Sequence, residues 1–149
     1  MTPKEGNRKI AVIDLFCGAG GLTRGFLDAG LPVVAGFDLD PDCQYAYEKN
    51  NQVPYYLHDV NKLTAKELEK HFGDAEIRVL AGCAPCQPFS SYTRVKDMDD
   101  KWKLVKSFAK LVQTTLPDIV TMENVPQLVK HRVFTVSYTH LTLPTILLV

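Results

Sequence analysis

A cysteine between two prolines is the strongest chemical signal in this sequence. Cys86 lies between Pro85 and Pro88, shortly after an apolar run that ends at Ala81. Because proline is excluded from helix interiors and central strands, this segment is expected to be a loop that follows a strand. A thiol on a rigid loop at the end of a strand is suited to nucleophilic catalysis.

The same cysteine is also half of a Cys-x-x-Cys pair with Cys83. This spacing leaves open a thiol–disulfide oxidoreductase, although Pro88 disfavours the helix in which such a pair normally lies. A structural zinc site would need a second close pair, and Cys17 and Cys43 are far apart in the sequence. We therefore expect no bound metal.

A glycine-rich turn near the N-terminus is the second signal. Residues 14–21 read Asp-Leu-Phe-Cys-Gly-Ala-Gly-Gly, a strand that runs into glycines and then into a helix. Glycines let the backbone turn sharply and approach a ligand, and the start of the helix offers free amide groups. The dinucleotide fingerprint would need a glycine at Thr23, so a nicotinamide cofactor is not supported.

Acidic residues follow three of the expected strands. Asp38 follows Gly20 at close to the spacing of about 20 residues at which an acid binds ribose hydroxyls. Asp59 follows the next strand, where a turn or helix-cap role is the simpler interpretation. The glycine turn and these two acids predict a pocket for an adenosine rather than for a pyrophosphate. Glu123 follows the last strand and should face the same crevice as Cys86, with helix capping as the alternative.

Short β-rich runs alternate with helical patterns, which predicts an α/β fold with a parallel sheet and helices on both faces. The first run is apolar on both faces and should lie in the middle of the sheet. The expected strands are 9–16, 32–37, 54–57, 77–81 and 118–122. The expected helices are 21–29, 41–50, 64–72 and 98–116, the last with an apolar face of Trp102, Val105, Phe108, Ala109 and Val112.

Composition is that of one ordinary globular domain. The chain has 149 residues, 46% of them hydrophobic, with 17 basic and 17 acidic residues, so its charge does not indicate a nucleic-acid or membrane surface.

We expect a disordered N-terminus over 1–8, one domain over 9–135 and an atypical tail over 136–149. The tail is β-prone and uncharged except for His140, and could be a native strand or an artefact. No signal peptide or membrane span is visible, which predicts a cytoplasmic protein with reduced thiols.

Three segments, in this order, resemble motifs of the DNA cytosine-5 methyltransferases: residues 14–21, the Pro-Cys-Gln-Pro-Phe-Ser segment 85–90 and the Glu-Asn-Val-Pro segment 123–126. The resemblance covers roughly residues 9–134. It implies a Rossmann-like S-adenosylmethionine-dependent fold, and methyl transfer to carbon 5 of a flipped cytosine through a covalent adduct with Cys86. Glu123 would hold and protonate ring nitrogen 3. Cys83 would then be a small buried residue beneath the nucleophile.

The resemblance also assigns binding residues. Asp38 would bind the ribose hydroxyls, Asp59 the adenine amino group and Leu39 the adenine ring. The cofactor-binding set is Phe16, Cys17, Gly18, Ala19, Gly20, Gly21, Asp38, Leu39, Asp59, Val60 and Pro85. The substrate-binding set is Gln87, Pro88, Phe89, Ser90, Asn124 and Val125.

Members of this family continue after Glu-Asn-Val with further strands, a target-recognition domain and a final helix, none of which is recognisable here. We therefore expect an incomplete fold that is inactive alone, with its fifth strand as a raw edge and with double-stranded DNA bound largely through a missing region. The expected setting is restriction-modification in the bacterial cytoplasm or at the nucleoid. Methylation of tRNA and a non-catalytic nucleotide-binding module remain alternatives.

Overall fold

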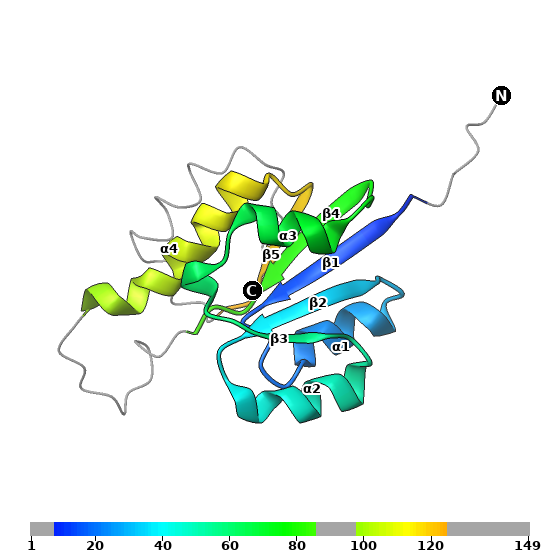
Figure 1. The fold of residues 1–149 in the computed structure, drawn as a ribbon, viewed down its shortest axis with the longest axis horizontal. Helices are drawn as coiled ribbons and strands as arrows, with labels where there is room; N and C mark the ends of the chain where they lie inside the picture. The colour runs from blue at the N-terminus through cyan, green and yellow to red at the C-terminus, as the bar shows by residue number, and fades with distance from the viewer. Residues whose placement is uncertain (1–7, 86–97, 125–149) are drawn as a thin grey trace.

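The computed structural model describes residues 8–85 and 98–124. They form a parallel five-stranded sheet in the order β3-β2-β1-β4-β5 (Figure 1). The strands are β1 (Ile10–Leu15), β2 (Val33–Asp38), β3 (Tyr55–Leu57), β4 (Ile77–Gly82) and β5 (Ile119–Met122). Each strand boundary lies within one residue of its prediction, and β1 is central as predicted.

Helices cover both faces of the sheet, as predicted (Figure 1). One face carries α1 (Gly21–Asp28) and α2 (Gln44–Asn51), and the other carries α3 (Ala65–Phe72) and α4 (Met98–Thr115). Two short 3-10 turns, η1 (Pro41–Cys43) and η2 (Val60–Lys62), follow β2 and β3.

The sheet separates two hydrophobic cores. Val12 and Ile13 are both fully buried, yet Val12 packs in the core beneath α1 and α2 whereas Ile13 packs in the core beneath α3 and α4. A central strand must therefore be apolar at consecutive positions, because successive side chains point to opposite faces. This explains why β1 reads as an almost unbroken apolar run.

Helix α1 ends where its glycine predicts. Gly30 has a φ of 77°, its N–H donates to the Leu27 carbonyl, and the N–H of Leu31 donates to the Phe26 carbonyl. These two hydrogen bonds form the Schellman motif that terminates helices at a left-handed residue. The chain then leads directly into β2.

The predicted helix 41–50 differs from the structure in its first turn. Asp40 accepts a hydrogen bond from the Asp42 amide, as an N-cap should, but the following residues form η1 before α2 begins. The capping box predicted for the next helix is present, since Thr64 and Glu67 each bond the other's amide.

The predicted apolar face of α4 is confirmed where the structure describes its side chains. Val105, Phe108, Ala109 and Val112 are all buried. Trp102, the fifth member of that face, lies outside the residues whose side chains are described, as do residues 1–7 of the expected disordered N-terminus and the whole tail 136–149.

Candidate active site

The candidate site lies at the edge of the sheet where the strands end. Because all five strands are parallel, the loops that follow them leave from this one edge. The register places Leu15 opposite Phe37 on one side and Gly82 on the other, and Gly82 opposite Met122. The predicted glycine turn, the predicted acids and the start of the predicted cysteine loop are therefore neighbours.

The glycine turn has a constrained backbone. Phe16 has a φ of 58°, which is unusual for a residue with a side chain, and Gly18 and Gly20 have φ values of 49° and 92°. A Cβ atom at Gly20 would collide with the Asn51 amide and lie 2.8 Å from the Tyr47 ring. Both conformation and close approach to α2 therefore require glycine at position 20.

Asp38 fastens this turn to the end of β2. Its Oδ2 accepts a hydrogen bond from the Gly18 amide at 2.8 Å, and its Oδ1 accepts from the amides of Leu39 at 2.7 Å and Asp40 at 3.0 Å. Three main-chain donors thus fix the orientation of a carboxylate that remains partly exposed. The Leu39 side chain beside it is 65% exposed, an apolar surface at the edge of the site.

A buried polar cluster lies directly before the glycine turn. Asp14 is completely buried, and its Oδ2 accepts a hydrogen bond from Thr23 Oγ1 at 2.7 Å. Thr23 Oγ1 is also 3.0 Å from the Tyr47 hydroxyl. Among the described residues, Asp14 Oδ1 has no hydrogen-bond partner. Burial raises the pKa of Asp14 to about 6, an effect that the Thr23 hydrogen bond partly opposes.

Sequence reasoning did not identify Thr23, Tyr47 or Asn51 as part of the site. Thr23 stands at the position where the dinucleotide-binding pattern has a glycine. Its hydroxyl group donates the hydrogen bond to Asp14. Tyr47 and Asn51 contact the glycine turn only because α2 packs beside it, which local sequence patterns do not reveal.

Asp59 caps a short turn after β3. Its Oδ1 accepts hydrogen bonds from the Asn61 amide at 2.9 Å and from Asn61 Nδ2 at 2.8 Å, and these bonds lower the pKa of Asp59. The simpler interpretation of this residue, a helix cap, is therefore confirmed. The neighbouring Val60 is buried in the core beneath α3 and α4. The predicted adenine contact of Asp59 remains a prediction.

The loops after β4 and β5 are linked by two hydrogen bonds. Cys83 Sγ donates to Glu123 Oε2 at 2.8 Å, and Asn124 Nδ2 donates to the Ala84 carbonyl at 2.8 Å. Cys83 is only partly buried, so the prediction of a buried residue was wrong. The reason is its position just beyond the last residue of β4, where its side chain meets Glu123 instead of the core.

Four further predicted cofactor residues are described, and two of them, Ala19 and Gly21, are exposed in the glycine turn. Cys17 is buried, and desolvation, with the nearby Asp14 and Asp38 carboxylates, raises the pKa of its thiol. Pro85 is exposed at the last described position of the loop after β4. The predicted nucleophile and most of the predicted substrate-binding set lie outside the described residues: Cys86, Gln87, Pro88, Phe89, Ser90 and Val125.

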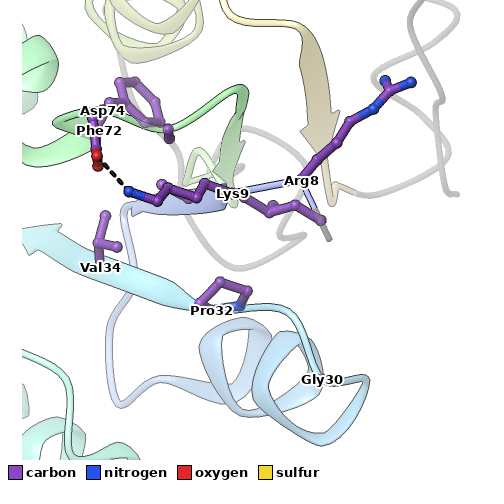
Figure 2. Close-up of a pocket in the computed structure, with 10 residues that line it drawn as sticks. Arg8, Lys9, Gly30, Pro32, Val34, Phe72 and Asp74 are labelled. Carbon is purple, nitrogen blue, oxygen red and sulfur yellow. Dashed lines mark hydrogen bonds and ion pairs between the residues drawn. The ribbon is translucent and has the colours of Figure 1, made fainter. Parts of the chain in front are cut away.

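A separate cleft of about 560 Å³ opens at the other edge of the sheet, where β1 and β2 begin (Figure 2). Lys9 and Asp74 form an ion pair across it, with Nζ and Oδ2 2.5 Å apart, and Pro32 and Val34 line its wall. None of the predicted site residues lines this cleft. It provides control positions that are remote from the candidate site.

Known proteins resemble this chain over most of its length. Residues 10–142 match the sequence model of a family described as C-5 cytosine-specific DNA methylase. The type II methylase M.HgiDII of Herpetosiphon aurantiacus is 45% identical over 117 residues, which cover 78% of this chain and 33% of that relative. The type II methyltransferase M.XorII of Xanthomonas oryzae pv. oryzae is 36% identical over 127 residues, covering 82% and 30% of the two chains.

A solved structure agrees with these sequence matches. A protein described as a DNA modification methyltransferase encoded within a prophage of E. coli superposes with a TM-score of 0.71 and 27% identity, covering 87% of this chain and 37% of that one. The chain thus spans about a third of the length of M.HgiDII and of M.XorII. In the described part of the chain there is no cluster of three or more metal-ligating side chains. No described helix is long and apolar enough to cross a membrane.

Proposed function

Because this chain belongs to the C-5 cytosine-specific DNA methylase family, we propose that it is the N-terminal catalytic part of a DNA cytosine-5 methyltransferase. The observation that carries the proposal is the link between two loops. The loop that leads into Pro-Cys-Gln-Pro is hydrogen-bonded to the loop that bears Glu123, at the same sheet edge as the glycine turn and Asp38. This link supports a site in which Glu123, Asp38, the glycine turn and the described start of the loop that leads towards Cys86 lie at the same end of the sheet.

The proposed cofactor is S-adenosylmethionine, and the described residues fit it. Asp38 is a partly exposed carboxylate held by three amides, as a ribose-binding acid should be, and the exposed Leu39 can lie against an adenine ring. Helix α1 starts without a side-chain cap and without an acidic residue in its first turn, so its amides suit a carboxylate. Within residues 8–85 and 98–124, Asp14 Oδ1 has no hydrogen-bond partner and remains available as an acceptor.

The chain's own residues would prepare the cytosine. S-adenosylmethionine, when bound, supplies an electrophilic methyl group. Carbon 5 of cytosine is a poor nucleophile, so Cys86 would add to carbon 6 of the flipped base and turn the ring into an enamine. Glu123 in its protonated form would donate a hydrogen bond to ring nitrogen 3 and so offset the negative charge that develops there. Once carbon 5 carries the methyl group, a general base would take the carbon 5 proton, and the electron pair of that C–H bond would form the 5,6 double bond as the Cys86 thiolate leaves.

Double-stranded DNA is the proposed substrate, in a restriction-modification setting in a bacterial cytoplasm. The type II methylases among the relatives support this setting, and the family description does not favour tRNA or thiol–disulfide exchange. The equal numbers of acidic and basic residues suggest that other segments supply most of the basic surface that binds phosphates.

Calorimetric titration with S-adenosylmethionine tests the pocket on this chain directly. We expect saturable binding in the micromolar range, and Asp38→Ala should weaken it at least tenfold, because two ribose hydroxyls and the Gly18 amide lose their acceptor. Lys9→Ala, in the remote cleft, should bind like the wild type. Absence of heat on folded protein at high micromolar ligand would contradict the proposal.

A further inference from the structure

Cys83 and Glu123 are held at fixed positions by the sheet. β4 and β5 pair with Gly82 opposite Met122, so these two residues are the first beyond a matched pair of strand ends. The N–H of Glu123 donates to the Gly82 carbonyl at 3.0 Å, and the N–H of Cys83 donates to the Leu15 carbonyl at 3.2 Å. A shift of either residue along the strand direction would break its main-chain hydrogen bond.

The strand end beneath Cys83 is also closely packed. A Cβ atom at Gly82 would lie 2.8 Å from the Phe108 ring and 3.0 Å from the Leu15 carbonyl oxygen. The backbone at this point therefore has no room to shift towards α4 or β1. The backbone of the next residue, Cys83, is therefore held in place as well, and this restricts where its side chain can make a contact.

The contact itself joins a thiol donor to a carboxylate acceptor. The S–H of Cys83 donates to Glu123 Oε2, a carboxyl oxygen that can accept a hydrogen bond whether or not the other oxygen carries a proton. The neighbouring bond from Asn124 to the Ala84 carbonyl keeps the two loops in register.

We propose that Cys83 is a positioning residue for Glu123. The thiol holds Oε2 and so limits rotation of the carboxylate, which leaves the other oxygen to engage the cytosine ring. This role rests on the function proposed above for Glu123. This role differs from the redox partner that the Cys-x-x-Cys spacing left open and from the small buried residue that the resemblance implied.

The contact can be measured on this chain without any assay of methyl transfer. In a Cys86→Ser background, Cys83 is the remaining cysteine of its tryptic peptide, and its alkylation by iodoacetamide at pH 8 can be followed by peptide mass. Glu123→Gln should accelerate alkylation several-fold, because loss of the adjacent negative charge favours the thiolate. Glu76→Gln, an exposed carboxylate just before β4, should leave the rate unchanged. If Cys83 is alkylated at the same rate in Glu123→Gln and in its Cys86→Ser parent, the hydrogen bond between Cys83 and Glu123 does not exist.

The positioning role is tested by steady-state kinetics on the full-length methyltransferase that carries this chain. Cys83→Ala should lower kcat about tenfold, the effect of losing one hydrogen bond, while the KM for S-adenosylmethionine stays within about twofold. Cys83→Ser keeps a donor and should recover most of kcat. Wild-type kcat in Cys83→Ala, or equal losses in Ala and Ser, would overturn the role. Absence of methyl transfer by the wild-type enzyme would instead refute the proposed function, while the alkylation result would still decide whether the contact exists.

Discussion

At the scale of single residues, the candidate site depends on carboxylates whose surroundings differ sharply. Asp38 is partly exposed and held by three amides, whereas Asp14 is fully buried with one oxygen unpartnered among the described residues. Their positions after strands made Asp38 and Glu123 recognisable in the sequence. The thiol contact of Cys83 was not foreseen, because it depends on which side chain the neighbouring strand presents.

The burial of Asp14 predicts a pH-dependent contribution to stability. Its pKa is about 6 in the folded protein and near 3.8 when unfolded, so the folded state binds the proton more tightly. The contribution of Asp14 is most favourable below about pH 4 and is lost as the pH rises through about 6, by about 2–3 kcal/mol.

Urea denaturation of the wild type and of Asp14→Asn, each at pH 4.5 and pH 7.5, measures this effect. The asparagine does not titrate, so the difference between the two proteins isolates Asp14 from the other groups. We expect the wild type to lose stability relative to Asp14→Asn at the higher pH. A difference that does not change with pH would show that Asp14 is not buried as described.

At the scale of elements, α1 and α2 form the support for the glycine turn. The pattern of apolar runs and caps was sufficient to predict all five described strands and the ends of α1 and α3, because those signals are local. It did not predict η1, since a 3-10 turn and an α-helical turn share the same N-cap. Nor could it predict that Tyr47 and Asn51 press against Gly20, because that contact is tertiary.

Two glycines of the turn provide a matched pair of substitutions. Gly18→Ala should cost about 1 kcal/mol of unfolding free energy, since its φ of 49° is unfavourable for alanine but no atom lies within 4 Å of the new Cβ. Gly20→Ala should cost about 2 kcal/mol more, because its methyl group also collides with α2. Equal losses for the two variants in chemical denaturation would contradict the packing of α2 against the turn.

At the scale of the whole molecule, the glycine turn, Asp38 and the two linked loops that carry Cys83 and Glu123 meet at one end of the parallel sheet. β5 is the last strand of the described sheet on its side. The sequence could indicate the fold and the family because both depend on patterns within the chain. It could not indicate which DNA sequence is recognised, because base contacts depend on the spatial placement of side chains, which a sequence pattern does not give.

The central claim is that this chain carries the nucleophile and cofactor pocket of a DNA cytosine-5 methyltransferase. The most direct measurement is transfer of a labelled methyl group from S-adenosylmethionine to duplex DNA by the full-length enzyme, compared with its Cys86→Ser variant. We predict label at carbon 5 of cytosine for the wild type and a loss of at least about a thousandfold in kcat for Cys86→Ser, because a serine hydroxyl is a far weaker nucleophile at neutral pH. Methyl transfer by Cys86→Ser at a rate near that of the wild type would contradict the account.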